Sequence, residues 1–193
     1  MTSTQKELLE HAICSTSNFR VHPLGFYFFK QQAEAELVQR IHVWLLPTDG
    51  LLTNDMHAHS YDIESSVVLG KLRNELLEFS EDAGGSILEF SVSYRGQKSV
   101  LELTGRRGKI RTLGTFDTGP GNRYCLQAGQ IHRALAKNMP CVTILNTRDR
   151  GHPILTYGSN HPTQPFPRRD VLPEETEAIK IALIEAIQLV GDN

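Results

Sequence analysis

The stretch "DMHAHSYDIESSVVLG" (residues 55–70) places two histidines one residue apart, follows them with acidic residues, and continues into an apolar run. In a β-strand, residues i and i+2 point to the same side, so His57 and His59 can both face the inside of a barrel from one edge. Two adjacent imidazoles supply two ligands to one metal ion. An isolated HxH pair is more typical of exposed loop histidines, so the metal hypothesis depends on the rest of the chain.

The sequence on both sides of this stretch consists of short β-branched and aromatic runs. Gly, Pro, Asn and Asp separate these runs throughout residues 19–169. Many short strands at close spacing are typical of an all-β sandwich or barrel, not of alternating β-α units. We expect strands at residues 25–32, 36–46, 65–79, 86–94, 99–105, 109–117, 123–127, 131–136 and 141–148.

Both ends of the chain predict helices. Residues 4–13 are weakly helical, and residues 173–190 begin with a proline and acidic residues, which suit the start of a helix. We expect this second helix to pack on the barrel or to contribute to a homodimer contact, through a stripe made of Ile179, Leu183, Ile187 and Val190. No repeat, low-complexity segment or linker divides the chain. The sequence therefore predicts one domain over residues 1–193, with the barrel core at about 19–169.

Composition and charge exclude several classes of function. The chain has 193 residues and a net charge of -2, which gives no electrostatic basis for binding nucleic acid or an anionic membrane. No apolar run approaches the roughly 20 residues that span a bilayer, and the N-terminus lacks a signal-peptide pattern. We therefore expect a soluble cytoplasmic protein. The basic run "GRRGKIR" (105–111) is expected to be a solvated hairpin tip.

The three cysteines predict neither a disulfide framework nor a cysteine-based zinc site. They are odd in number and widely spaced, at Cys14, Cys125 and Cys141, and none forms a CxxC pair. We expect reduced thiols, with Cys125 and Cys141 in the core because both lie in apolar strand-like runs.

A second stretch strengthens the metal hypothesis. In "GNRYCLQAGQIHRALAKN" (121–138), Gly121 precedes a turn, Gly129 suits a tight turn, and His132 begins a strand-like run. Together with the HxH pair and Gly70, this stretch resembles the two signature motifs of the cupin superfamily. Those motifs read G-x5-H-x-H-x3,4-E-x6-G and G-x5-P-x-G-x2-H-x3-N.

The resemblance covers roughly residues 36–158, with departures. Leu51 stands where the first motif begins with glycine, and Gln127 and Ala136 replace the proline and asparagine of the second motif. Within cupins, the chain is most similar to a poorly characterised subgroup with an H-x-H-P-W-D-F-x-S-x-I-L-x-G segment. The matching positions are His57, His59, Asp62, Ser65 and Gly70.

The resemblance implies an all-β fold, the cupin double-stranded β-helix or jelly-roll barrel, often dimeric, with a metal ion inside its mouth. The implied ligands are His57, His59 and His132. Three imidazoles leave coordination positions open, which suits non-haem Fe(II) and also Mn, Ni or Zn. Fe(II) is favoured.

A carboxylate ligand is a separate question. The motif count back from Gly70 falls on Ile63, so Glu64 lies one residue out of register. A bulge before Glu64 would restore it as a fourth ligand, because one extra residue flips every following side chain. Asp62 is a candidate for holding the second N–H of a ligand imidazole. A three-histidine site is the simplest expectation.

Two further residues are candidates for substrate contacts. "QRIHVWLL" (39–46) alternates, with Ile41 and Val43 on the packed face, so Arg40 and His42 either line the cavity rim or face solvent. The solvent-facing orientation is favoured, but the planar guanidinium of Arg40 would match a substrate carboxylate. Tyr124 would donate a hydrogen bond to a bound ligand if it faces inward.

By the resemblance, the leading function is a mononuclear non-haem Fe(II) dioxygenase acting on a small organic molecule. The alternatives are a non-redox isomerase or epimerase that uses a divalent metal as a Lewis acid, and a cupin that binds a small ligand without turnover. GxGxxG, Walker-type, GxSxG and HExxH motifs are all missing from the sequence, so nucleotide-dependent, serine hydrolase and zincin chemistry have no support.

Overall fold

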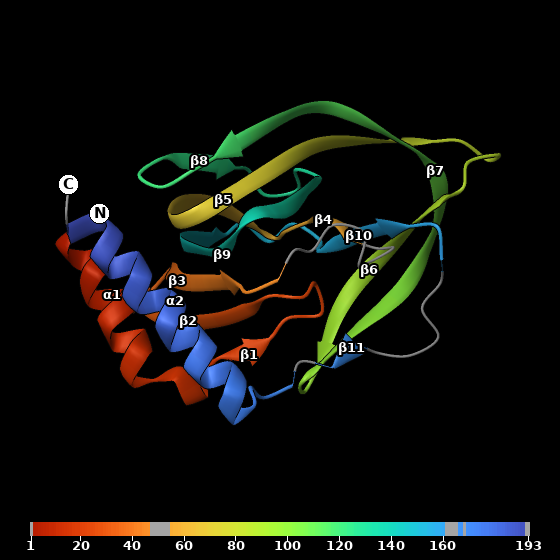
Figure 1. The fold of residues 1–193 in the computed structure, drawn as a ribbon. Coiled ribbons are helices and arrows are strands. Elements are labelled where there is room, and N and C mark those ends of the chain that lie inside the picture. Colours follow the sequence, from red (N-terminus) through yellow and green to blue (C-terminus); the bar gives the residue numbers. More distant parts are fainter. Residues whose placement is uncertain (1, 47–54, 161–165, 168, 192–193) are drawn as a thin grey trace.

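Three long antiparallel strands organise the molecule: β5 (Tyr61–Glu81), β7 (Lys98–Thr118) and β9 (His132–Asp149) (Figure 1). The computed structural model describes residues 2–46, 55–160, 166–167 and 169–191. The shorter strands are β1 (Arg20–Val21), β2 (Tyr27–Glu34), β3 (Leu37–Trp44), β4 (Met56–Ala58), β6 (Ile87–Arg95), β8 (Arg123–Leu126), β10 (Leu155–Gly158) and β11 (Phe166–Pro167).

The strands form a sheet that closes on itself. Neighbouring strands follow the order β1-β2-β3-β9-β4-β10-β6-β7-β5-β8, and β11 pairs with β7. Strand β5 also pairs with β9, although the two are distant in this order. This extra pairing joins the two halves of the sheet into a barrel. The jelly-roll fold expected from the sequence is confirmed.

Gly70 is the bend that allows β5 to follow β9 around the barrel. Before the bend, β5 pairs with the second half of β9, from Tyr61 opposite Asp149 onward; after it, β5 pairs with the first half, up to Leu76 opposite His132. Gly70 has a φ of 73°, and a Cβ there would lie 2.4 Å from the Asn138 carbonyl oxygen. Only glycine fits such a conformation at such a close approach.

Two pairs of expected strands are single strands in the structure. Residues 99–105 and 109–117 belong to β7, so the basic run 105–111 lies inside a strand and is not a hairpin tip. The glycines of this run lie where the pairing partner of β7 changes. Leu103 lies opposite Phe90 of β6, and Gly108 lies opposite Glu81 of β5. Likewise, residues 131–136 and 141–148 fall together in β9, apart from Ile131.

Two helices cover one outer face of the barrel, α1 (Ser3–Cys14) and α2 (Pro173–Gly191), with a 3-10 turn η1 (Thr16–Asn18) after α1 (Figure 1). Both helices expected at the chain ends are confirmed. Thr2 and Gln5 cap α1 reciprocally. The buried cluster under the helices includes Leu8, Leu9, Ile41, Val43, Ile179 and Leu183.

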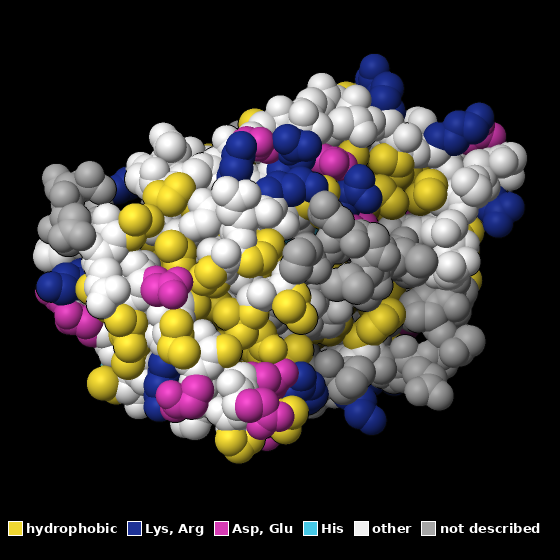
Figure 2. Space-filling view, viewed as in Figure 1, with side chains coloured by type: hydrophobic (Ala, Val, Ile, Leu, Met, Phe, Trp, Pro, Cys, Tyr) yellow, Lys and Arg dark blue, Asp and Glu magenta, His cyan; other side chains and the backbone are white. Residues whose placement is uncertain are grey.

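On the side that α1 and α2 cover, hydrophobic side chains also reach the surface (Figure 2). Ile181 and Ile184 of α2 are exposed. The expected homodimer stays a prediction. Within the described residues, no helix is long and apolar enough to cross a membrane.

All three cysteines are free thiols. Cys141 is buried as expected, but the expectation for Cys125 was wrong, because Cys125 is exposed. It lies between Tyr124 and Leu126 in β8, and both of these neighbours pack inside the barrel. Strand alternation therefore turns Cys125 outward.

Glu175 fastens the start of α2 to the barrel. Its carboxylate accepts hydrogen bonds from the Tyr27 hydroxyl at 2.9 Å, from Arg169 at 2.7 Å and from the Leu172 amide at 2.8 Å. The hydrogen bonds from Arg169 are the main reason that the pKa of Glu175 falls to about 2.

We expect Glu175→Gln to lower the free energy of unfolding at pH 7 by about 0.5–1 kcal/mol, because the ion pair is partly solvated. A carboxyl whose pKa is lower in the folded than in the unfolded protein stabilises the fold at pH values above its unfolded pKa. This contribution disappears as the group protonates in the folded protein. The difference between wild type and variant should therefore shrink as the pH falls from 4.5 towards 2. Urea unfolding across this range measures it. Glu177→Gln, which removes only an exposed pair with Lys180, is the control. A pH-independent difference would contradict the prediction.

Candidate metal centre

The structure brings together the three histidines that the sequence singled out. His57 lies in β4, His59 follows that strand, and His132 begins β9 directly opposite His57. One nitrogen from each imidazole lies within 4.8 Å of the other two. The ring centroids are 4.7, 4.5 and 5.2 Å apart. Three nitrogens this close can share one ion.

Backbone carbonyls set the tautomers of two of these rings. Nδ1 of His57 lies 2.7 Å from the Asp55 carbonyl oxygen, and Nδ1 of His132 lies 3.2 Å from that of Gln130. A carbonyl oxygen only accepts, so Nδ1 carries the hydrogen in both rings and donates it. The Nε2 lone pairs are then free to bind a metal, an arrangement common among histidine ligands.

Burial keeps all three imidazoles neutral. It lowers the pKa of His57, lowers that of His59 well below its ordinary value, and lowers that of His132 to about 3. The neighbouring imidazoles of His57 and His132 lower the pKa of His59 further, and that of His57 lowers the pKa of His132 further. The neutral ring is the form that binds metals.

A glycine turn before β9 holds the two histidine segments together. The Gly129 amide donates to the His59 carbonyl oxygen at 2.9 Å. Gly129 has a φ of 77°, and a Cβ there would lie 2.8 Å from Nδ1 of His152. The "AGQ" turn is therefore bonded directly to the HxH segment, which explains why the two motifs meet.

Asp62 supports this turn and does not contact an imidazole. Its carboxylate accepts from the Ala128 amide at 2.9 Å and from Arg150 Nε at 2.6 Å. The bond from Ala128 is the first cause of its lowered pKa. The expected hydrogen bond from a ligand histidine N–H to Asp62 is absent from the described structure, and the Asp62 oxygens accept from Ala128 and Arg150 instead.

Glu64 lies outside the histidine group. Its side chain is exposed and pairs with Arg123 at 3.4 Å. Strand β5 pairs with β9 without a register shift from Tyr61 to Val67, so the bulge that Glu64 needed to face inward is missing from this described part of the chain. Ile63 and Ser65 on either side of it are buried. The register count from Gly70 therefore predicted its outward orientation correctly.

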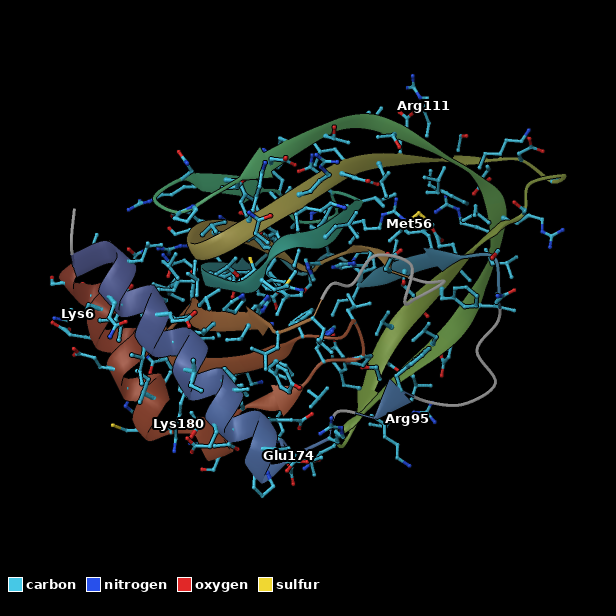
Figure 3. All side chains as sticks on the ribbon, viewed as in Figure 1. Lys6, Met56, Arg95, Arg111, Glu174 and Lys180 are labelled. Carbon is cyan, nitrogen blue, oxygen red and sulfur yellow. The ribbon has the colours of Figure 1, made fainter. Side chains whose placement is uncertain are left out.

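The histidines open into a cavity of about 180 Å³ inside the barrel. Strand β4, which carries His57, lies at the end of the barrel away from the helices, as the labelled Met56 beside it shows (Figure 3). Apolar side chains, aliphatic and aromatic, make up most of the other walls, and the aromatic ones include Phe26, Phe28, Trp44, Tyr61, Tyr124 and Phe166.

Arg40 and His42 line this cavity, so the expectation that they face solvent was wrong. The helices cover the opposite face of β3, where Ile41 and Val43 are buried. Burial lowers the pKa of His42 to about 3. The Arg40 guanidinium lies 4.5 Å from the centre of the Tyr61 ring, and its buried Nε has no hydrogen-bond partner among the described residues. Arg40 is thus a cation available to a ligand.

Tyr124 also faces the cavity, and burial raises its pKa to about 12. Behind it lie polar residues that sequence reasoning did not identify as functional. Ser65, Asn74 and Thr143 are fully buried, and apart from the interaction of Ser65 and Asn74 with the Tyr124 hydroxyl, their side chains lack well-formed hydrogen bonds in the described part of the chain. The signal for Asn74 was its period-2 spacing from Leu72 and Leu76, which marks an inward position.

Comparison with known proteins finds similarity to solved structures. No protein-family model matches the sequence, and no curated protein matches it significantly. Similar structures include the oxalate decarboxylase of Lactobacillus farciminis in a formate complex, at 14% identity and a TM-score of 0.43, with 70% of this chain and 31% of that chain covered. Another is KdgF from Halomonas sp., at 18% identity and a TM-score of 0.39, with 67% and 83% covered.

A third similar structure is the hydroquinone 1,2-dioxygenase PnpCD in complex with Cd²⁺ and 4-hydroxybenzonitrile, at 16% identity and a TM-score of 0.38, with 61% of each chain covered. The chain spans less than two thirds of the length of the decarboxylase and of PnpCD. Likeness at this level carries no argument about activity, so the case for a function rests on the site itself.

We expect Asp62→Ala to loosen the turn before His132, because the Ala128 amide loses its acceptor. Amide hydrogen exchange at Ala128 and Gly129 should become faster by about 10-fold, as for a locally destabilised turn. The matched control is Asp82→Ala, because the Asp82 carboxylate also accepts a hydrogen bond from a backbone amide, that of Gly84. Equal exchange at the Ala128 turn in both variants would argue against this role for Asp62.

Proposed function

We propose that this chain is a metal-dependent enzyme of the cupin type, with one divalent ion held by His57, His59 and His132. The observation that carries the proposal is the group of three imidazoles, one buried and two half-buried, whose ligand nitrogens lie within 4.8 Å of one another and open into a cavity. If His57 and His59 were merely an exposed pair, the position of His132 beside them, on a distant strand, would have no explanation.

The donor set fits a divalent transition metal. Three neutral nitrogen ligands suit Fe(II), Mn, Ni or Zn, and they leave coordination positions for a substrate. No carboxylate joins the histidines among the described residues. We favour Fe(II) and a dioxygenase reaction on a small organic molecule, following the motif resemblance to cupins. When bound, such an ion supplies Lewis acidity and a place to activate O₂.

The protein's own residues would bind and orient the substrate. Arg40 offers a planar fork to a carboxylate, and its place over the Tyr61 ring puts it next to His59, which stacks on the same tyrosine at 4.5 Å. The apolar walls exclude water, which strengthens this ion pair. Tyr124 stays protonated at neutral pH and donates a hydrogen bond inside the cavity.

We expect protein purified without oxygen to contain close to one equivalent of metal, and His57→Ala and His132→Ala to lose most of it, because each removes one of three ligands. Elemental analysis measures the content. His42→Ala is the matched control, since His42 lines the cavity but lies outside the ligand group. Unchanged metal content in the two ligand variants would refute the metal site.

Oxygen consumption then separates the reaction classes. Iron-loaded protein is offered a panel of thiols and small carboxylates, and uptake with one of them supports a dioxygenase. Metal binding without any uptake would instead favour a non-redox isomerase or epimerase, or a ligand-binding cupin.

We expect Arg40→Met to weaken binding of benzoate by about 10- to 100-fold, the loss typical of a charge-assisted hydrogen-bonded pair. Binding of benzamide, which has the same shape without the charge, should change little. Arg40→Lys should recover part of the loss, because lysine keeps the charge but not the fork. Calorimetry on all three proteins measures the affinities. Equal losses for benzoate and benzamide would show that Arg40 acts through packing alone.

A further inference from the structure

Three neutral polar side chains meet on the inner wall of the barrel: Ser65 and Asn74 of β5, and Tyr124 of β8. Ser65 and Asn74 are 0% exposed. Tyr124 is partly buried and is the member of the three that lines the cavity, and its hydroxyl interacts with both of the other side chains. We call these three residues the inner polar cluster.

Strand alternation directs this cluster into the barrel. Ser65 lies opposite Tyr124 in the β5–β8 ladder, and its i−2 and i+2 neighbours, Ile63 and Val67, belong to the interior hydrophobic clusters. Asn74 lies between two positions, 72 and 76, whose leucines also pack in the interior. All three side chains therefore face the barrel interior and not the helices or solvent.

Burial of the inner polar cluster lowers the stability of the fold. Apart from their interaction with the Tyr124 hydroxyl, Ser65 Oγ and both amide atoms of Asn74 have no well-formed hydrogen bond among the residues that the structure describes. Each unsatisfied buried polar group costs about 1–3 kcal/mol. An apolar side chain of similar size would avoid that cost. Buried polar groups left unpaired in this way call for a functional explanation.

The position of the cluster relative to Arg40 suggests that one small ligand reaches both. Arg40 lies opposite Leu145 in one ladder, and Ser65 lies opposite the same Leu145 in the next ladder. The two backbones are thus two strand spacings, about 10 Å, apart. Their inward side chains shorten the gap to about the length of one substituted ring.

We infer that the inner polar cluster, with the Tyr124 hydroxyl at the cavity wall and Ser65 and Asn74 behind it to orient it, binds a neutral hydroxyl or carbonyl group of the substrate. A hydroxyl, a phenol and a primary amide offer both donors and acceptors but no charge, so they suit a neutral polar group and not a second carboxylate. Aliphatic and aromatic side chains make up most of the remaining cavity wall. The substrate class is then an aromatic or similarly apolar ring that carries a carboxylate at one end and a hydroxyl at the other. This inference depends on the proposed function in one respect only, the role of the three histidines as metal ligands.

The first test measures stability and needs no ligand. Asn74→Leu and Ser65→Ala replace the unpaired groups with apolar ones of similar or smaller size. We expect Asn74→Leu to raise the melting temperature by about 2–4 °C, the shift that about 1 kcal/mol produces in a chain of this length. A lower melting temperature for both variants would show that the cluster supports the fold, and would overturn the inference.

The second test measures recognition with two probes, 4-hydroxybenzoate and 4-methylbenzoate, which differ only by a hydroxyl and a methyl of similar size. Calorimetry on the wild type should show a preference of at least about 10-fold for the hydroxyl, because a site with buried polar groups rejects a ligand that leaves them unpaired. Asn74→Leu and Tyr124→Phe should reduce that preference to within about twofold. Ser66→Ala, whose hydroxyl contacts Gln5 outside the barrel, is the control and should keep it.

Binding is measured on metal-free protein and again after loading with Zn(II), which separates this inference from the proposed function. A hydroxyl preference in the metal-free protein supports the cluster even if the histidines bind no metal. Equal affinity for the two probes, or binding of neither, in both forms would overturn the inference. A preference seen only with Zn(II) would assign the hydroxyl to the ion and also overturn it.

Discussion

The pairing of β5 with β9 is the contact on which the rest of the molecule depends. It joins the strand that follows the HxH segment to the strand that begins with His132, and it closes the sheet into a barrel. Gly70 makes the pairing continuous around the bend, because any side chain at that position would collide with the backbone of β9. The cavity and the meeting of the three histidines are consequences of this closure.

Barrel closure together with the helices also gives β3 two covered faces that differ in composition. The outer face of β3 packs under α1 and α2 through Ile41 and Val43, while its inner face carries Arg40 and His42 into the cavity. Polar and charged residues on the inner face would be unremarkable on an ordinary half-solvated sheet. Here the helices cover the outer face of β3, so its polar residues lie inside the barrel and line the cavity.

Much of the site could be predicted from short-range patterns. The histidine spacing, the glycines at 70 and 129, and the register that turned Glu64 away are all local features, and the structure agrees with them. The orientation of Arg40 and the exposure of Cys125 were mispredicted because each depends on which face the helices or the barrel cover. The continuity of β7 was missed because its glycines signal a turn locally, while the partner strands on each side keep the segment extended. Asn74 escaped notice because one polar residue among the mixed charged and apolar residues 71–78 forms no motif.

The Gly129–His59 hydrogen bond has a consequence for how the protein is made. Some 70 residues of chain separate His57 and His59 from His132, so neither segment can form the site alone. Contacts of such high sequence separation form late, after the entropy of closing the intervening loop has been overcome. The nascent chain therefore has no preassembled histidine group, and a metal ion bound by the proposed site would meet a finished barrel. The identity of that ion would then depend on which metals are available to the folded protein.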